Sequence, residues 1–115
     1  MTRRASALAR AFAGRWRIAE ADAWDNDDLD LVETAHITFE GDHGGSFAFV
    51  AVTGQLDVRY GSRDGSACAE FSWEGFKDAA PASGRGWVAL GTAGRPVGHI
   101  FTHNSEDSGF VAEPD

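Results

Sequence analysis

The chain has 115 residues, of which 43% are hydrophobic, with eight Phe, four Trp and a formal net charge of −8. This length and composition predict one folded domain over residues 1–115, with a single core, and they exclude a disordered chain. The acidic balance argues against a nucleic-acid partner, because such a partner needs a basic face.

The N-terminal residues and the cysteine count indicate a cytoplasmic protein. The basic start resembles a leader, but Arg10 interrupts any apolar run, so we expect no signal peptide. No stretch has transmembrane length, and we expect no membrane partner. The single cysteine, Cys68, rules out an intrachain disulfide and fits a reducing cytoplasm. Leu8 and Phe12 share one face of a helix, which predicts a short amphipathic helix within residues 1–13 that packs against one end of the fold.

From Gly14 onward, apolar and polar residues alternate as in strands that bury one face. Turn sequences rich in Gly, Asn and Asp separate the alternating runs. Short sequential strands joined by tight turns are typical of an all-β, eight-stranded antiparallel up-and-down barrel, which we expect over residues 14–113. A rolled, half-open sheet is the main alternative. The predicted strands lie at about residues 14–24, 34–40, 46–52, 55–60, 68–75, 84–90, 96–103 and 108–113.

The hairpin registers are predicted from the positions at which the apolar residues change from odd to even numbers in the sequence, or the reverse. The apolar positions change parity between Ala51 and Leu56, which a two-residue turn at Thr53-Gly54 would explain. The predicted cross-strand pairs are Phe47 with Tyr60, Phe49 with Val58, Phe39 with Phe47, Tyr60 with Ala69, and Val58 with Phe71.

The segment between Phe71 and Trp87 predicts a mouth for the barrel. A loop over residues 77–83 would place Trp73 opposite Trp87 on the inner face, a pair that contributes up to about 1 kcal/mol. Arg85 would share this inner face, nearer the loop. An eight-stranded barrel has room for its side chains or one small ligand, so we expect a largely closed core. The large side chains predicted to point inward are Trp16, Ile18, Ile37, Phe39, Phe47, Phe49, Leu56, Val58, Tyr60, Phe71, Trp73, Trp87, Phe101 and Phe110.

Several short motifs are similar to those of known proteins. Gly14-Arg15-Trp16 resembles the Gly-x-Trp signature of lipocalin-like (calycin) barrels, which implies that Trp16 closes the barrel floor. Further motifs are Trp24-Asp25, Ala35-His36-Ile37-Thr38-Phe39, Phe71-Ser72-Trp73-Glu74-Gly75, Ser83-Gly84-Arg85-Gly86-Trp87 and Glu106-Asp107-Ser108-x-Phe110. With these motifs the chain resembles a family of short bacterial proteins of uncharacterised function, apart from Gly109, where that family has Ala. The resemblance implies a fold and no activity.

One acidic segment is a candidate for binding a cation. Asp25, Asp27, Asp28 and Asp30 lie within six positions and could hold a hard ion such as Ca²⁺. The EF-hand spacing fails, because Leu29 occupies the third ligand position. A solvated loop, or one that pairs with the N-terminal arginines, explains the segment more simply. We therefore expect no bound metal and no cofactor.

The histidines do not form a predicted catalytic site. His99 and His103, four residues apart on one strand, would lie roughly 13 Å apart and so cannot bind one zinc ion. One histidine with Asp107 or Glu106 could still make a site, although a hydrogen-bonded histidine near the rim is the simpler interpretation. No nucleophile elbow and no phosphate-binding loop is present in the sequence, so we predict no catalytic residues.

Three functions remain open. The first is a carrier or sensor of a small polar or anionic molecule at a mouth made by Trp73, Arg85, Trp87 and His103, with Trp16 as a further candidate. The second is a non-enzymatic interaction module with a filled core. It would bind a protein partner or a second copy through an outer strand face or the acidic loop. The third, an enzyme built in the mouth, lacks a nucleophile and a base placed together.

Overall fold

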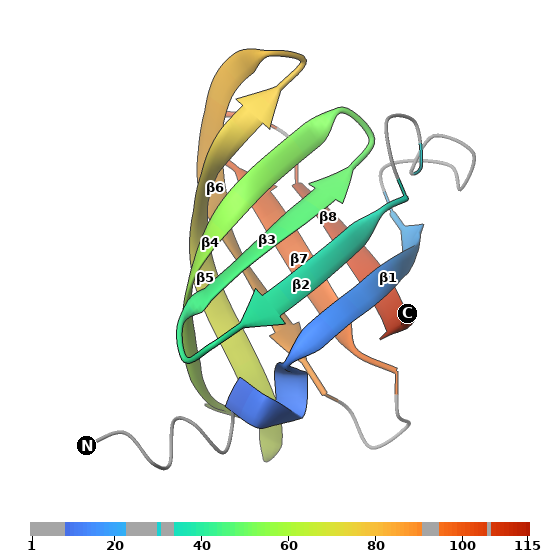
Figure 1. Ribbon diagram of the computed structural model, residues 1–115, viewed down its shortest axis with the longest axis vertical. Helices are drawn as coiled ribbons and strands as arrows, with labels where there is room; N and C mark the ends of the chain where they lie inside the picture. Colours follow the sequence, from blue (N-terminus) through green and yellow to red (C-terminus); the bar gives the residue numbers. More distant parts are fainter. Residues whose placement is uncertain (1–8, 23–29, 31–33, 91–94, 106) are drawn as a thin grey trace.

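The computed structural model describes residues 9–22, 30, 34–90, 95–105 and 107–115. Eight antiparallel strands form a closed barrel in which each strand pairs with the next and the last pairs with the first (Figure 1). This confirms the predicted up-and-down barrel and contradicts the half-open sheet. The strands are β1 (Gly14–Ala21), β2 (His36–Glu40), β3 (Gly44–Phe49), β4 (Val52–Arg63), β5 (Ser66–Lys77), β6 (Ala80–Ala89), β7 (Val97–Thr102) and β8 (Asp107–Pro114).

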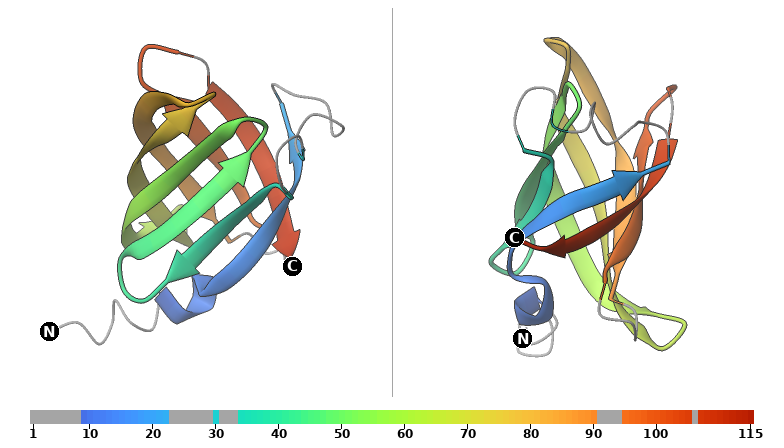
Figure 2. Two further views of the ribbon diagram at one scale, coloured as in Figure 1. Left: turned by 45° about the horizontal axis from the view of Figure 1, so that its top comes forward. Right: turned by 90° about the vertical axis from the view of Figure 1, so that its right-hand side faces the viewer.

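Closure of the barrel depends on β1, which lies between β2 and β8 (Figure 2). The register of β1 against β8 shifts between Ile18 and Glu20, and a bulge of this kind bends a strand as closure requires. Within the described residues, no helix is long and apolar enough to cross a membrane.

A short helix at residues 9–12 lies under one end of the barrel (Figure 1). Phe12 is 0% exposed, and its ring centroid lies 5.5 Å from those of Phe39 and Tyr60. The indole Nε1 of Trp16 donates a hydrogen bond to the Phe12 carbonyl oxygen at 2.7 Å, which ties the helix to β1. The predicted packing of Phe12 is therefore confirmed, and Trp16 lies at the floor. Leu8 lies outside the described residues.

The core pairs its largest rings with glycines on neighbouring strands. A Cβ atom at Gly86 would lie 2.5 Å from Phe71 Cζ, and one at Gly98 would lie 2.6 Å from Phe110 Cζ. Since the interior of an eight-stranded barrel is only just wide enough for side chains, Phe47, Phe71, Trp73 and Phe110 fill the space that a missing side chain leaves at the facing glycine, whereas at Gly45 that space is taken by Leu56. The pairs are Phe39 with Gly45, Phe47 with Gly54, Phe71 with Gly86, Trp73 with Gly84, and Phe110 with Gly98.

The predicted registers between β2 and β3 and between β3 and β4 are wrong, because they pair large rings with each other and not with glycines. The β3–β4 turn falls at Val50-Ala51, so Phe47 faces Gly54 and not Tyr60. Phe39 likewise faces a glycine and not Phe47. Val50 takes a φ of 55°, which is unfavourable for a β-branched residue, so packing in the core overrides the local turn preference. The predicted pairs between β4 and β5, Tyr60 with Ala69 and Val58 with Phe71, are confirmed.

The predicted pairing of Trp73 with Trp87 is also wrong. The β5–β6 turn consists of two residues, Asp78 and Ala79, with φ values of 51° and 70°, as in a type I′ turn. With this short turn Trp73 lies in the core, whereas Trp87 lies on the outer face. Arg85 shares the outer face with Trp87, and its predicted inward position is therefore wrong.

A third inward position is also corrected. Phe101 is 41% exposed on the outer face of β7, and its neighbour Ile100 is the buried residue. Both are large and apolar, so either could have been assigned to the core, and only the register against β6 and β8 decides between them.

Candidate functional site

The structure separates the residues predicted to form a ligand-binding mouth. The Trp73 indole is buried, and its Nε1 donates a hydrogen bond to the Phe101 carbonyl oxygen at 3.2 Å. Arg85 and His103 are exposed and line one shallow hollow on the outside of the barrel. Trp16 lies at the floor, beside the helix. The predicted residues therefore do not surround one interior mouth.

The interior of the barrel is filled by its own side chains. Phe47 packs edge-to-face against Trp73, with ring centroids 5.0 Å apart. One hollow inside the barrel, lined by residues that include Ile18, Phe49 and Phe110, is too narrow to hold a water molecule. The prediction of a largely closed core agrees with this packing.

The outer face over β4 to β7 carries a hollow of about 470 Å³, here called the outer groove. The strand registers arrange its side chains in two rows across the sheet. One row runs from Arg59 through Glu70 to Trp87, and the next runs from Asp57 through Ser72 and Arg85 to Phe101. The outer groove is lined by Asp57, Arg59, Arg63, Glu70, Phe71, Ser72, Arg85, Gly86, Trp87 and Phe101.

Trp87 is covered on one side by a cation. The guanidinium carbon of Arg63 lies 4.4 Å from the centroid of the Trp87 ring, a cation–π contact. Cys68 lies close by on β5 and is buried. Burial raises the pKa of the Cys68 thiol, and Glu70 adds to this effect, whereas Arg63 acts in the opposite direction. Because the thiolate is the reactive form, this environment agrees with a structural role for Cys68.

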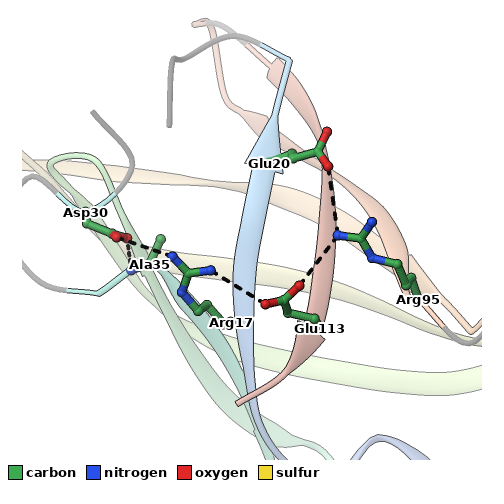
Figure 3. A network of polar contacts seen from close by, with 6 residues as sticks. All are labelled: Arg17, Glu20, Asp30, Ala35, Arg95 and Glu113. Atoms are coloured by element: carbon green, nitrogen blue, oxygen red, sulfur yellow. Dashed lines mark hydrogen bonds and ion pairs between the residues drawn. The ribbon is translucent and has the colours of Figure 1, made fainter. Parts of the chain in front are cut away.

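The arginines of the described residues differ in their partners. Arg15 pairs with Asp115 at 2.6 Å. Arg17 and Arg95 both contact Glu113, and they extend to Asp30 and Glu20, with N–O distances of 3.6–3.8 Å (Figure 3). In contrast, Arg59, Arg63 and Arg85 have no carboxylate at ion-pair distance within the described part of the chain. The outer groove thus holds arginines without ion-pair partners in a protein with 18 acidic residues.

Of the four candidate cation ligands in the acidic segment, Asp30 belongs to the described residues, and its contacts are structural. One carboxylate oxygen accepts a hydrogen bond from the backbone N–H of Ala35 at 2.8 Å, and the other lies 3.8 Å from Arg17 (Figure 3). The other candidate cation ligands, Asp25, Asp27 and Asp28, lie outside the described residues. Among the residues that the structure describes, no three His, Cys, Asp or Glu side chains converge on a metal position.

His99 contacts the carboxylate of Asp107, as the sequence suggested for one histidine and a nearby acid. The distance from Nε2 to Oδ2 is 2.5 Å, and the imidazole packs against the Phe101 ring at 4.5 Å. The contacts of His99 with Asp107 and with Phe101 lie on the outer face of β7, next to the outer groove. The imidazole of His99 packs against Phe101 at the edge of the outer groove.

Sequence reasoning found Arg85 and Trp87 but missed Arg59, Arg63 and Phe101. Arg59 and Arg63 lie four residues apart on β4, and an even spacing on a strand is the signal for a shared face. This spacing places both arginines on one face of the strand, but it indicates a site only once Arg85 is also placed on the outer face. Phe101 was assigned to the core because its size suggested burial.

Comparisons with protein-family models, with curated proteins and with solved structures each gave no match to this chain. The eight-stranded barrel is therefore the part of the resemblance that the structure confirms. Membership of a lipocalin-like family and a bacterial origin stay predictions.

Proposed function

We propose that this protein is a non-enzymatic interaction module, in which the filled barrel is a scaffold and the outer groove contacts a partner protein. The observation that carries the proposal is the contrast between the two faces of the sheet. The interior hollow cannot hold a water molecule, whereas the outer groove has a volume of about 470 Å³.

The composition of the outer groove supports a protein partner. Tryptophan, other aromatic residues and arginine are enriched in the centres of protein interfaces, where they supply most of the binding energy. Trp87, Phe101 and Arg85 are adjacent in the outer groove. The barrel is closed by pairing of its first and last strands, so we expect a partner to bind the side chains of the outer groove and not to extend the sheet. A carrier of a small ligand at an interior mouth loses its basis, because Trp73 and Arg85 lie on opposite faces.

The proposal is tested by capturing partners with wild-type protein and with Phe101→Ser as baits. Val97→Ser is the matched control, because Val97 lies on the same strand with 43% exposure, against 41% for Phe101, but does not line the outer groove. We expect a protein that wild type and Val97→Ser retain and Phe101→Ser loses.

Binding of that protein, once purified, must then be reproduced by calorimetry with the same order of affinities. Retention that is unaffected by Phe101→Ser, or no retained protein, would contradict the proposal.

A further inference from the structure

We infer that the outer groove recognises an acidic segment of the partner protein, with Arg85 binding a carboxylate and Phe101 and Trp87 contacting an adjacent apolar side chain. This inference rests on the proposed function and adds the chemistry of the partner. It is carried by the surroundings of Arg85, the distribution of the arginines and the shape of the surface.

Arg85 lies at a position prepared for an anion. Its nearest neighbours on the outer face are Ser72 and Phe101 across the sheet, and Ser83 and Trp87 along β6, and none of these four is charged. Glu70 and Glu74 lie diagonally from Arg85 on β5, and neither is at ion-pair distance from it. Two of the four nearest neighbours, Phe101 and Trp87, are aromatic, and Arg85 itself is exposed and open to a ligand from solvent. A guanidinium has a planar fork of donors that matches the two oxygens of a carboxylate.

The remaining arginines make the outer groove locally positive. Arg59 and Arg63 join Arg85, against two carboxylates, Asp57 and Glu70. The whole chain has a net charge of −8, so this balance is the reverse of the average surface. On the side of the barrel formed by β1 and β8, each arginine already has a carboxylate partner. An incoming carboxylate therefore meets cations at the outer groove that no carboxylate of the described chain neutralises at ion-pair distance.

The shape of the surface favours an extended segment over a compact molecule. The outer groove shares Ser72 with two further hollows, one of about 1080 Å³ toward Phe76 and Pro81 and one of about 590 Å³ toward His103, and Glu74 lines both of them. Along these hollows the apolar side chains of Phe76 and Phe101 lie among polar ones, so we expect the acidic residue of the segment at Arg85, away from Glu74, and its apolar residue beside Phe101. A nucleic acid fits poorly, because its phosphates are closely spaced along the strand, whereas the outer groove offers three arginines on a chain with a net charge of −8.

The test uses selection from a displayed library of random twelve-residue peptides on the full chain. Three proteins are compared: wild type, Arg85→Gln and Arg95→Gln. Arg95→Gln is the matched control, because it removes the same charge from a partly exposed arginine outside the outer groove. We expect wild type and Arg95→Gln to enrich peptides that combine Asp or Glu with an aromatic or aliphatic residue, and Arg85→Gln to lose this enrichment.

The affinity of one selected peptide then gives the magnitude. Arg85→Gln should weaken binding by about tenfold, as expected for the loss of a charge-assisted hydrogen bond, and replacing the peptide's Glu and Asp with Gln and Asn should have a similar effect. Arg85→Lys should lie between wild type and Arg85→Gln, whereas Arg95→Gln should change the affinity by less than about twofold, since exposed charges at a distance are screened. Unchanged melting temperatures confirm that the variants fold.

Three results would overturn the inference: no enriched peptide, enriched peptides without acidic residues, or equal losses for Arg85→Gln and Arg95→Gln. The proposed function fails separately, in the capture experiment with Phe101→Ser. A partner that requires Phe101 but not Arg85 would retain the interaction module and reject the acidic segment.

Discussion

Replacing Gly54 with alanine is expected to destabilise the barrel, although alanine is normally the better residue in a strand. A Cβ atom at this position would lie 2.7 Å from Phe47 Cε2 and 2.8 Å from Trp73 Cε3. The two rings are buried and pack edge-to-face at 84°, so neither can move away without disturbing the other. The new methyl group therefore overpacks the centre of the core.

The expected magnitude follows from this overlap. Overpacking a well-filled core costs about 1–3 kcal/mol, which lowers the melting temperature of a chain of this size by roughly 4–12 °C. Gly61 is the matched control on the same strand, since a Cβ atom there meets nothing within 4 Å. Gly61→Ala should raise the free energy of unfolding by about 0.5–1 kcal/mol, because alanine loses less backbone entropy on folding. Urea denaturation followed by circular dichroism measures both variants.

A double variant tests the cause of the effect. If the methyl group collides with the Phe47 ring, adding Phe47→Leu to Gly54→Ala should restore part of the stability, with a coupling of about 0.5–3 kcal/mol. The reasoning is refuted if Gly54→Ala is as harmless as Gly61→Ala, because ring-to-glycine packing would then not set the register of the core.

Three further predictions concern the buried Phe12 and Cys68 and the partly buried Tyr60. Phe12→Ala should lower the free energy of unfolding by about 3–5 kcal/mol, because it opens a cavity between the helix and the barrel floor. A loss below about 1 kcal/mol would show that the helix does not pack against the barrel. Burial, with a smaller effect of Asp42, raises the pKa of Tyr60 to about 12 from 10.0, so the folded state keeps its proton where the unfolded state has lost it. Stability should thus fall between about pH 10 and 12, and Tyr60→Phe should reduce this fall; identical pH profiles would argue against a raised pKa. Cys68 should react with a thiol reagent at pH 8 far more slowly in the native protein than in urea, and comparable rates would show that the thiol is accessible.

The sequence alone determined the architecture. Alternation of apolar and polar residues is local, and it identified all eight strands, with differences at their ends. The short connections between the strands then made the up-and-down barrel the simplest arrangement. The packing of Phe12 against one end of the barrel was also predicted correctly, because its position relative to the first strand is set by a few intervening residues, and Trp16 lies where the resemblance to lipocalin-like barrels implied.

The pairing of strands across turns was only partly determined by the sequence. Between β4 and β5, local turn chemistry and core packing agree, because Asp64-Gly65 occupies a two-residue turn and the expected pairs form. Between β3 and β4 they conflict, and Val50 accepts a positive φ so that Phe47 can face Gly54. Sequence reasoning paired large residues with large ones, whereas the limited width of the barrel requires a ring to face a glycine.

The candidate site was decided by the tertiary structure, because side chains in a strand alternate between two faces. A shift of the register by an odd number of residues moves every side chain of β6 to the opposite face. Trp73 faces Gly84, three residues from its expected partner Trp87, so Arg85 and Trp87 lie outside while Trp73 stays in the core. The sequence therefore identified the residues with unusual chemistry. Only the closed barrel, whose interior has no space left for them, determined that Arg85 and Trp87 face outward beside Arg59, Arg63 and Phe101.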